Sequence, residues 1–359
     1  MKILLVRLRL IGDVVFTTPV IAALRRRYPD AYIEYLVEAG AAPIVETNPH
    51  LNRVRVVAHS RGWQRLRDDA SLAKALRGER FDLAIDLHGG PRSAWLTWAS
   101  RAPRRVGYDV AGRSWMYTSV VHRPRELRPR HSVENQWDLL PAVDAAFSAS
   151  ASPDRDRVEM PVDLAAAASV NRRLVALGLG GGAQVQLIVL HVSAGNPFRR
   201  WPEASFAVLA ADLVQDDTRR WIVVTSGPSD HEAAVRVIAA ARARAGAAGQ
   251  RIVEAEGLTL SELRALMDRA ALFVGGDSGP LHIAATSDVP VVGLYGPTLP
   301  ERSAPWRPSR IPTASVDAGV LPCRPCDQRV CAPGDFRCLT GVPAETVRDA
   351  ARRLLEIAR

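Results

Sequence analysis

The stretch 273–286, FVGGDSGPLHIAAT, constrains the fold of this chain more than any other. The apolar run at its start predicts a buried parallel strand, and the two glycines that follow allow the backbone to turn sharply. Asp277 and Ser278 then stand where a helix would be capped, and the apolar segment 289–295 predicts a second buried strand. Such a succession is half of a nucleotide-binding layout, because the amides at a helix start favour anions. An ordinary glycine-rich turn of an α/β protein is the alternative, and the rest of the chain has to decide between the two.

The alternation of strands and helices continues through the whole chain. Apolar segments with strand character are followed by helical segments, which is typical of a parallel, doubly wound sheet. The predicted strands are 3–6, 31–37, 53–57, 83–87, 187–190, 221–224, 251–253, 269–274 and 289–295, and 106–108 is predicted as the end of a strand. The predicted helices are 14–28, 41–47, 71–77, 93–100, 165–177, 206–215, 231–244, 260–268 and 343–358.

A break in this pattern divides the chain into two domains, which is the natural expectation for 359 residues. The segment 144–163 is rich in Ala, Ser, Pro and charge and is the best linker candidate. We therefore expect an α/β protein with two facing Rossmann-like doubly wound domains, over 1–160 and 161–342, and a cleft between them. A C-terminal helix over 343–359 is expected to pack back on the N-terminal domain.

Composition and charge limit the classes of function. No run of about 18 apolar residues is present, so we expect no membrane-spanning helix. Arg7 and Arg9 interrupt the apolar N-terminal run, which predicts a first strand rather than a signal peptide and therefore a cytoplasmic protein. The net charge is +9, and because Lys2 and Lys74 are the only lysines, arginine carries nearly all of the positive charge. No nucleic-acid motif accompanies these arginines, so the basic surface suits anionic substrates or an anionic membrane face rather than DNA.

Two turns after predicted strands carry residue types suited to catalysis or anion binding. Asp13 lies just beyond the first strand, where its carboxylate would either cap a helix or accept a proton from a substrate hydroxyl. After the strand 187–190, a turn contains Ser193 and Arg199, which would bind a diphosphate unless they belong to an ordinary surface loop. Taken singly, each turn leaves both interpretations open.

Taken together, the motifs of the chain resemble those of glycosyltransferase family 9, the ADP-heptose:lipopolysaccharide heptosyltransferases. The resemblance covers nearly the whole chain in order, and its most specific parts are the N-terminal Gly-Asp-Val turn and the block 276–282. The residues that carry it are GDVVFTTP (12–19), DLHG (86–89) with RS (92–93), RVGY (105–108), RRWP (199–202), GP (227–228) with Glu232, GDSGPLH (276–282) and GPT (296–298).

The resemblance implies a GT-B fold, with an acceptor-binding N-terminal domain and a nucleotide-sugar-binding C-terminal domain. It also implies heptose transfer with inversion and without a metal in the chemistry. Asp13 matches the proposed catalytic base of the family. On the donor side, Arg199 matches a residue that holds the diphosphate, Glu232 one near the ribose, and Asp277 one that contacts the sugar hydroxyls. The further positions matched around the phosphates are Ser278, Gly279 and His282.

Two features keep alternatives open within this resemblance. Arg9 and Leu10 stand where family members often carry small or hydroxyl residues, so the donor and the acceptor are not fixed by the motifs. His282 would also fit a histidine that is simply packed inside a helix.

Arginines in N-terminal loops are the candidates for binding an acceptor. Arg61, Arg92 and Arg113 would suit the carboxylates and phosphates of an inner-core glycolipid, although each also fits a solvated basic surface. We expect a nucleotide-sugar donor and an anionic glycolipid acceptor as partners and no nucleic acid. The enzyme is expected to be a monomer that contacts the inner face of the cytoplasmic membrane peripherally.

The four cysteines of the chain lie together near its C-terminus, at Cys323, Cys326, Cys331 and Cys338. In a reducing cytoplasm such spacing does not indicate a disulfide framework. It is compatible with a structural zinc site, with free or oxidised thiols, or with an iron–sulfur cluster. In each case the cysteines would fix the loop before the last helix, and no metal is expected in the catalytic site.

Several other functions compete with heptose transfer. A GT-B transferase that uses another donor, such as a UDP-sugar, and a nucleotide-sugar epimerase would share the two-domain fold. A nicotinamide-dependent oxidoreductase is disfavoured, because no Gly-x-Gly-x-x-Gly follows the first strand. A catalytically silent nucleotide-binding protein would not need Asp13 beyond a capping role.

Overall fold

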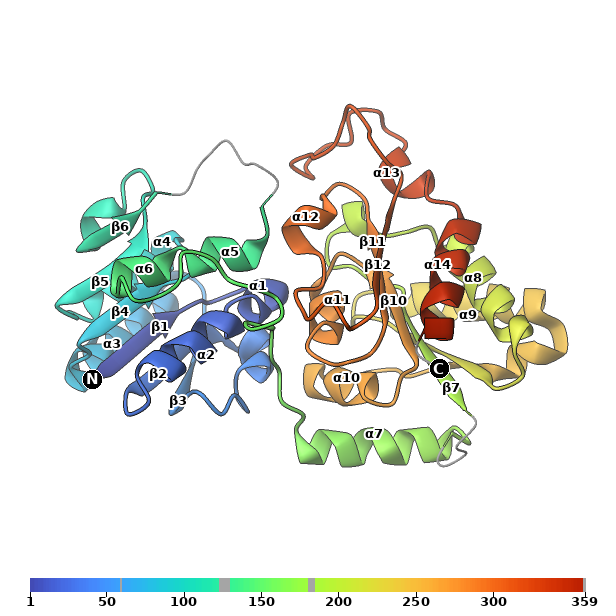
Figure 1. The fold of residues 1–359 in the computed structure, drawn as a ribbon, viewed down its shortest axis with the longest axis horizontal. Helices are drawn as coiled ribbons and strands as arrows, with labels where there is room; N and C mark the ends of the chain where they lie inside the picture. Colours follow the sequence, from blue (N-terminus) through green and yellow to red (C-terminus); the bar gives the residue numbers. More distant parts are fainter. Residues whose placement is uncertain (59, 123–129, 180–184, 358–359) are drawn as a thin grey trace. The chain divides into compact units, whose positions relative to one another are not determined.

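The computed structural model describes residues 1–58, 60–122, 130–179 and 185–357, and the chain divides into two compact units. Unit 1 comprises Met1–Pro161 and unit 2 comprises Val162–Arg359 (Figure 1). This division falls beside the boundary that the sequence predicts after residue 160. Across the described ranges, we find no helix that is both long and apolar enough to cross a membrane.

Unit 1 is built on a six-stranded parallel sheet with the order β3-β2-β1-β4-β5-β6. Its strands are β1 (Lys2–Val6), β2 (Tyr32–Glu38), β3 (Arg53–Val57), β4 (Leu83–Asp86), β5 (Arg104–Tyr108) and β6 (Ser119–Val121). In register, Val6 at the end of β1 lies between Leu36 of β2 and Asp86 of β4. The order reverses between β1 and β4, which is the topological switch point of a doubly wound sheet.

The helices of unit 1 differ in places from the predicted segments. They are α1 (Ile11–Val15), α2 (Thr18–Arg27), η1 (Ala39–Ile44), α3 (Gly62–Glu79), α4 (Pro91–Ala99), η2 (Ser114–Met116), α5 (Ser132–Trp137) and α6 (Leu139–Val143). The single helix predicted over 14–28 is broken at Thr17, whose hydroxyl is within 2.7 Å of both the Val14 carbonyl oxygen and the Tyr35 hydroxyl. Helix α3 begins nine residues earlier than predicted. The prediction missed its first half because this half is exposed, with Trp63 83% exposed, and carries no apolar periodicity.

The segment predicted as a linker is largely part of unit 1. Asp156 is buried and pairs with Arg26 of α2 at 2.6 Å, and Val158 and Met160 are buried as well. The polar composition of the segment did not predict these contacts, because a buried aspartate that pairs with an arginine cannot be told from a surface aspartate in the sequence.

Unit 2 repeats the architecture of unit 1, with the strand order β12-β11-β10-β7-β8-β9. The strands, all parallel, are β7 (Gln186–His191), β8 (Arg220–Thr225), β9 (Ile252–Glu254), β10 (Leu272–Gly276), β11 (Val291–Tyr295) and β12 (Thr313–Asp317). The helices are α7 (Leu164–Ala176), η3 (Pro197–Arg199), α8 (Glu203–Asp216), α9 (His231–Ala245), η4 (Gly246–Arg251), α10 (Leu260–Met267), α11 (Gly279–Ala284), α12 (Pro300–Ser303), α13 (Arg337–Thr340) and α14 (Ala344–Ile357). The switch point of this sheet lies between β7 and β10.

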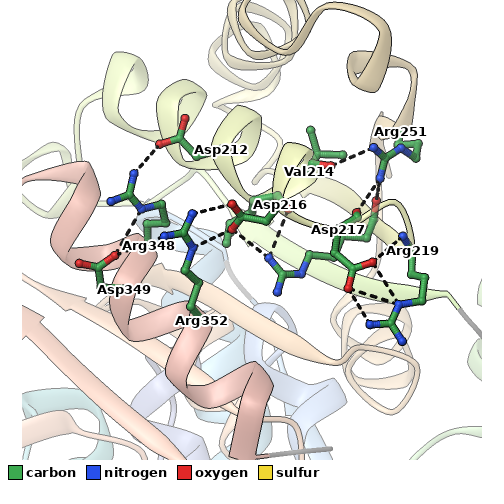
Figure 2. Close-up of polar contacts among 11 residues, drawn as sticks. Asp212, Val214, Asp216, Asp217, Arg219, Arg251, Arg348, Asp349 and Arg352 are labelled. Carbon is green, nitrogen blue, oxygen red and sulfur yellow. Dashed lines mark hydrogen bonds and ion pairs between the residues drawn. The ribbon is translucent and has the colours of Figure 1, made fainter.

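The C-terminal helix α14 packs on unit 2, not on unit 1 as we expected from the sequence. Its apolar face, which includes Val347 and Leu355, belongs to the same buried core as β10 and α8. On its polar face, Arg352 forms a bidentate pair with Asp216 of α8 at 2.7 and 2.5 Å, as Figure 2 shows. An amphipathic pattern predicts that a helix face is buried but not which surface covers it. Residues 358 and 359 of the predicted helix lie outside the described residues.

Candidate active site

The predicted catalytic and donor residues follow the strands that flank the two switch points. Asp13 comes after β1 in unit 1, while Ser193 and Arg199 come after β7 and Asp277 comes after β10 in unit 2. Ligands of open α/β sheets bind at this place, outside the carboxyl ends of the strands where the order reverses. The topology therefore gives each unit its own candidate site.

Asp13 of unit 1 has both a structural partner and access to solvent. Its carboxylate lies 2.6 Å from the Arg7 guanidinium and accepts a hydrogen bond of 3.3 Å from the Leu10 amide at the start of α1. The side chain is still 35% exposed. Capping and proton transfer are thus compatible for this residue, since the cap uses one oxygen only.

The turn after β4 stands beside Asp13 and is organised by a buried carboxylate. Asp86 accepts hydrogen bonds from the amides of His88 and Gly89 and from the hydroxyls of Ser93 and Tyr117, at 2.6 to 3.0 Å. Burial raises the pKa of Asp86, although these four donors oppose the rise. The carboxylate fixes the direction in which the turn leaves the sheet.

His88, carried by this turn, is held in its neutral form. Burial lowers its pKa to about 4, aided by the charges of Arg7 and Arg9 and opposed by Asp13. Its Nδ1 atom is buried without a hydrogen bond to any described residue. Near Asp13 the protein thus supplies a neutral imidazole, to which the sequence analysis gave no role.

Arg199 is the central cation of the unit 2 site. Its Nη1 lies 3.0 Å from the Asp277 carbonyl oxygen and 3.2 Å from the Asp277 carboxylate, and its Nε donates to the Gln328 side-chain oxygen at 2.7 Å. Its Nη2 has no hydrogen bond to a described residue. Gly276 permits this arrangement, because a Cβ there would lie 2.9 Å from the Arg199 carbonyl oxygen.

Asp277 is buried but charged. Its carboxylate accepts a hydrogen bond of 2.5 Å from Thr298 and lies 3.5 Å from the imidazole Nε2 of His282, whose side chain is 6% exposed. Burial raises the pKa of Asp277, but His282, Arg199 and Thr298 outweigh it and hold the pKa at about 2. The predicted residues Arg199, Asp277 and His282 are therefore brought into one cluster.

Ser193 and Glu232 lie at a second part of the unit 2 site. The Ser193 hydroxyl donates a short hydrogen bond to the buried Asp230, which also pairs with Arg200 at 2.8 Å. Asp230 and Arg200 line a pocket of about 170 Å³, and so does Glu232, in the first turn of α9 and 92% exposed. This exposed carboxylate is open to a ligand.

Ser278 and Gly279 form the start of α11. Ser278 is the residue that precedes the helix, and its hydroxyl donates to the Gly276 carbonyl oxygen at 3.2 Å. Gly279 is the first helical residue, and the helix is only six residues long. The strand, turn, helix and strand predicted over 273–295 are all present.

The three arginines predicted for the acceptor differ in their surroundings. Arg92 in α4 is 10% exposed and pairs with Asp69 at 2.6 Å and Glu38 at 3.2 Å, so its charge is already neutralised within unit 1. Arg61, which precedes α3, is exposed. Arg113, which precedes η2, has a buried Nε without a hydrogen bond to a described residue. Arg61 and Arg113 are therefore better placed than Arg92 to meet an anionic ligand.

Comparison with known proteins decides the family. A model described as glycosyltransferase family 9 (heptosyltransferase) matches residues 70–333, which is most of the chain. The chain belongs to glycosyltransferase family 9. It is a glycosyltransferase, as its motifs predict.

Relatives of this family 9 chain match it over almost its full length. It is 29% identical to lipopolysaccharide heptosyltransferase 3 of Escherichia coli, over 97% of both chains. A family 9 glycosyl transferase structure from Veillonella parvula is 23% identical, with a TM-score of 0.84 over 99% of this chain and 97% of that one. The structure of E. coli ADP-heptose lps heptosyltransferase II is 22% identical, with a TM-score of 0.79 over 99% of both chains. The predicted GT-B fold with two Rossmann-like domains is confirmed, and the expected cleft between them stays a prediction.

The four cysteines of this glycosyltransferase line one pocket of about 120 Å³, together with Phe198 and Phe336. They are free thiols, and burial raises the pKa of Cys338. In the described part of the chain, no three His, Cys, Asp or Glu side chains are arranged to hold a metal ion. A structural zinc ion at the thiols therefore stays a prediction.

The sequence analysis missed three residues that contact the side chains predicted to bind the donor. Asp230 follows the GP motif at 227–228, and Thr298 ends the GPT motif at 296–298, so both had a signal in the sequence. Gln328 had none, because it reaches Arg199 from 129 positions along the chain.

Proposed function

We propose that this glycosyltransferase transfers heptose from ADP-heptose to a lipopolysaccharide inner-core or related glycan acceptor, with inversion of configuration. Support comes from the relatives, whose names describe lipopolysaccharide heptosyltransferases. The observation that carries the proposal is the cluster in which Arg199 meets the buried, ionised Asp277 at the switch point of unit 2. An ionised carboxylate accepts sugar hydroxyls, and a guanidinium beside it binds a diphosphate.

In the proposed reaction, Asp13 takes the proton from an acceptor hydroxyl as the hydroxyl oxygen attacks the anomeric carbon of the donor. The bond from this carbon to the diphosphate oxygen breaks, and ADP leaves as an anion. Arg199 stabilises the charge that develops on the diphosphate through Nη2, which has no hydrogen bond to a described residue. Glu232, on the rim of the second pocket, binds the ribose hydroxyls.

The acceptor is an anionic glycolipid on this proposal, and the enzyme acts at the inner face of the cytoplasmic membrane. Arg61 and Arg113 are its proposed contacts, since their charges are less committed than that of Arg92. A monomeric state stays a prediction.

Calorimetric titration with ADP and with UDP tests the donor assignment. We expect selective binding of ADP that falls at least tenfold in Arg199→Ala, since a charge-assisted hydrogen bond contributes about 1.5–3 kcal/mol. Arg219→Ala is the matched control. Arg219 pairs with Asp217 on the surface, and its substitution removes the same charge from unit 2. Selective UDP binding would assign another donor sugar, and activity on the donor without an acceptor would indicate an epimerase.

The Asp13→Asn variant tests the chemistry. Asparagine is isosteric, and its oxygen can still accept hydrogen bonds from the Leu10 amide and from the Arg7 guanidinium, so the fold should be retained at some cost from the lost ion pair, and ADP affinity should stay unchanged. Transfer should fall by about 10²- to 10⁴-fold, as is typical when a general base is removed. The control is Asp30→Asn, at an exposed position after α2. Transfer at the wild-type rate would reduce Asp13 to a helix cap.

A further inference from the structure

Gln328 joins the cysteine-rich segment, residues 321–340, to the donor site. Its side-chain oxygen accepts hydrogen bonds from Nε of Arg199 at 2.7 Å and from the side-chain nitrogen of Asn196 at 2.8 Å. The orientation of this amide follows from chemistry, because an arginine Nε can only donate. Asn196 is fixed in the same way, since its oxygen accepts the Phe198 amide at 3.0 Å.

The backbone of the cysteine-rich segment adopts an unusual conformation at two residues that contact the turn 196–199. Gln328 has φ of 59° and Phe336 has φ of 52°, values that residues other than glycine rarely adopt. The Phe336 ring meets the Phe198 ring edge-to-face, with centroids 5.2 Å apart. Both left-handed residues therefore contact the turn 196–199, and such conformations persist where the surroundings determine them and often mark functional sites.

The segment is also bound to the turn that supports Asp277. The Cys326 amide donates to the Pro297 carbonyl oxygen at 3.2 Å, and Arg324 donates to the Thr298 carbonyl oxygen at 3.0 Å. The Thr298 hydroxyl in turn donates to Asp277. The segment thus contacts the turn that carries Arg199 and the turn that supports Asp277.

We propose that residues 321–340 form a positioning segment of the donor site, in which Gln328 orients Arg199 toward the donor diphosphate. This rests on the proposed function. With Nε held by Gln328 and Nη1 by Asp277, the guanidinium plane is fixed, and Nη2 keeps N–H groups that the proposal assigns to the diphosphate. A neutral amide suits this position, because it accepts the Nε hydrogen bond without adding negative charge beside a diphosphate.

Three substitutions at Gln328 separate positioning from folding. Gln328→Gly removes the side-chain oxygen and relieves the left-handed backbone, so its thermal stability should not fall, while ADP affinity should drop about three- to tenfold because Arg199 is no longer preorganised. Gln328→Ala should lose the same affinity. Gln328→Glu keeps a hydrogen-bond acceptor but should bind ADP at least as weakly as Gln328→Ala does, because its carboxylate neutralises the charge of Arg199. Val320→Ala, at a fully exposed residue just before the segment, is the control.

A double-mutant cycle decides whether Gln328 acts through Arg199. In the Arg199→Ala background, Gln328→Gly should change ADP affinity less than twofold, since no guanidinium remains to be oriented. Two outcomes would overturn the positioning role and leave the proposed function intact. One is that the losses of ADP affinity in Gln328→Gly and Arg199→Ala add up in the double variant. The other is that Gln328→Gly binds ADP like the wild type while Arg199→Ala binds it more weakly. If Arg199→Ala also binds ADP normally, the donor-site assignment fails together with the inference.

Discussion

At the scale of single residues, the protein shifts the pKa values of buried groups according to their neighbours. Asp277 is held charged because a histidine, an arginine and a hydroxyl surround it. His191, at the end of the neighbouring strand β7, is held neutral. Burial lowers its pKa to about 4, with Asp230 opposing, and its Nδ1 atom lies 3.0 Å from the Thr225 hydroxyl. A buried group keeps its charge only where opposite charges and hydrogen bonds outweigh the cost of burial, as they do at Asp277 but not at His191.

His191 should make stability fall as the pH falls. Its folded pKa lies below the ordinary value of 6.5, so between about pH 6.5 and 4 the unfolded chain binds a proton that the folded chain does not. The free energy of unfolding should therefore decrease across this window as the pH is lowered, by up to about 3 kcal/mol from this residue. Urea unfolding at pH 7 and pH 4.5 measures the change.

The variant His191→Gln should lose less stability over the same window, because it has no proton to take up. Part of the decrease should remain, since the pKa of His88 is lowered in the same direction. His122→Gln, at a histidine whose side chain is 78% exposed, is the control and should match the wild type. An unchanged decrease in His191→Gln would contradict the interpretation.

At the scale of elements, α14 is held to unit 2 by two kinds of contact. Leu355 is 2% exposed inside the core, whereas Arg352 and Arg348 pair with Asp216 and Asp212 of α8 near the surface (Figure 2). Apolar burial should dominate, because partly exposed ion pairs are screened by water and lose side-chain entropy.

Substitutions in α14 compare the two contacts directly. Leu355→Ala should lower the free energy of unfolding by about 2–4 kcal/mol, since it removes buried methyl groups and leaves a cavity. Arg352→Ala should lower it by less than about 1 kcal/mol. Chemical denaturation of both variants provides the measurement, and a larger loss for Arg352→Ala would show that the ion pairs hold the helix.

At the scale of the whole molecule, the proposed roles are divided between the units. Arg199, Asp277, Glu232 and Gln328 all belong to unit 2, and Asp13 belongs to unit 1. Each unit has its own six-stranded sheet and its own buried apolar cluster. On the proposed division of roles, nucleotide binding should need unit 2 only, whereas sugar transfer should need both units.

A fragment comprising residues 162–359 should fold alone and bind ADP within about threefold of the full chain, because a domain of this size buries a sufficient core. It should have no transfer activity, since it lacks Asp13. Circular dichroism and calorimetric titration check the two statements, with the same fragment carrying Arg199→Ala as the control. A folded fragment that fails to bind ADP would contradict the division of roles.

Local patterns predicted much of this architecture. The period of apolar residues and the turns rich in Gly, Pro and Asp gave most strands to within a few residues, and the parallel doubly wound arrangement followed from their alternation. The same turns held Asp13, Arg199 and Asp277, because ligand-binding residues of such sheets lie just after strands. Strands β6 and β12 and helices α5, α6, α12 and α13 escaped prediction, since they are short and lack a full period.

The sequence by itself therefore determined the class of fold and the turns that carry the proposed site. The tertiary structure decided which residues meet across those turns: Arg7 with Asp13, Thr298 with Asp277, and Gln328 with Arg199. It also decided that α14 covers the sheet of unit 2. The physical reason is that periodicity and turn chemistry act over a few neighbouring residues, whereas a partner for a buried charge or an apolar face is chosen by packing between segments far apart in the chain.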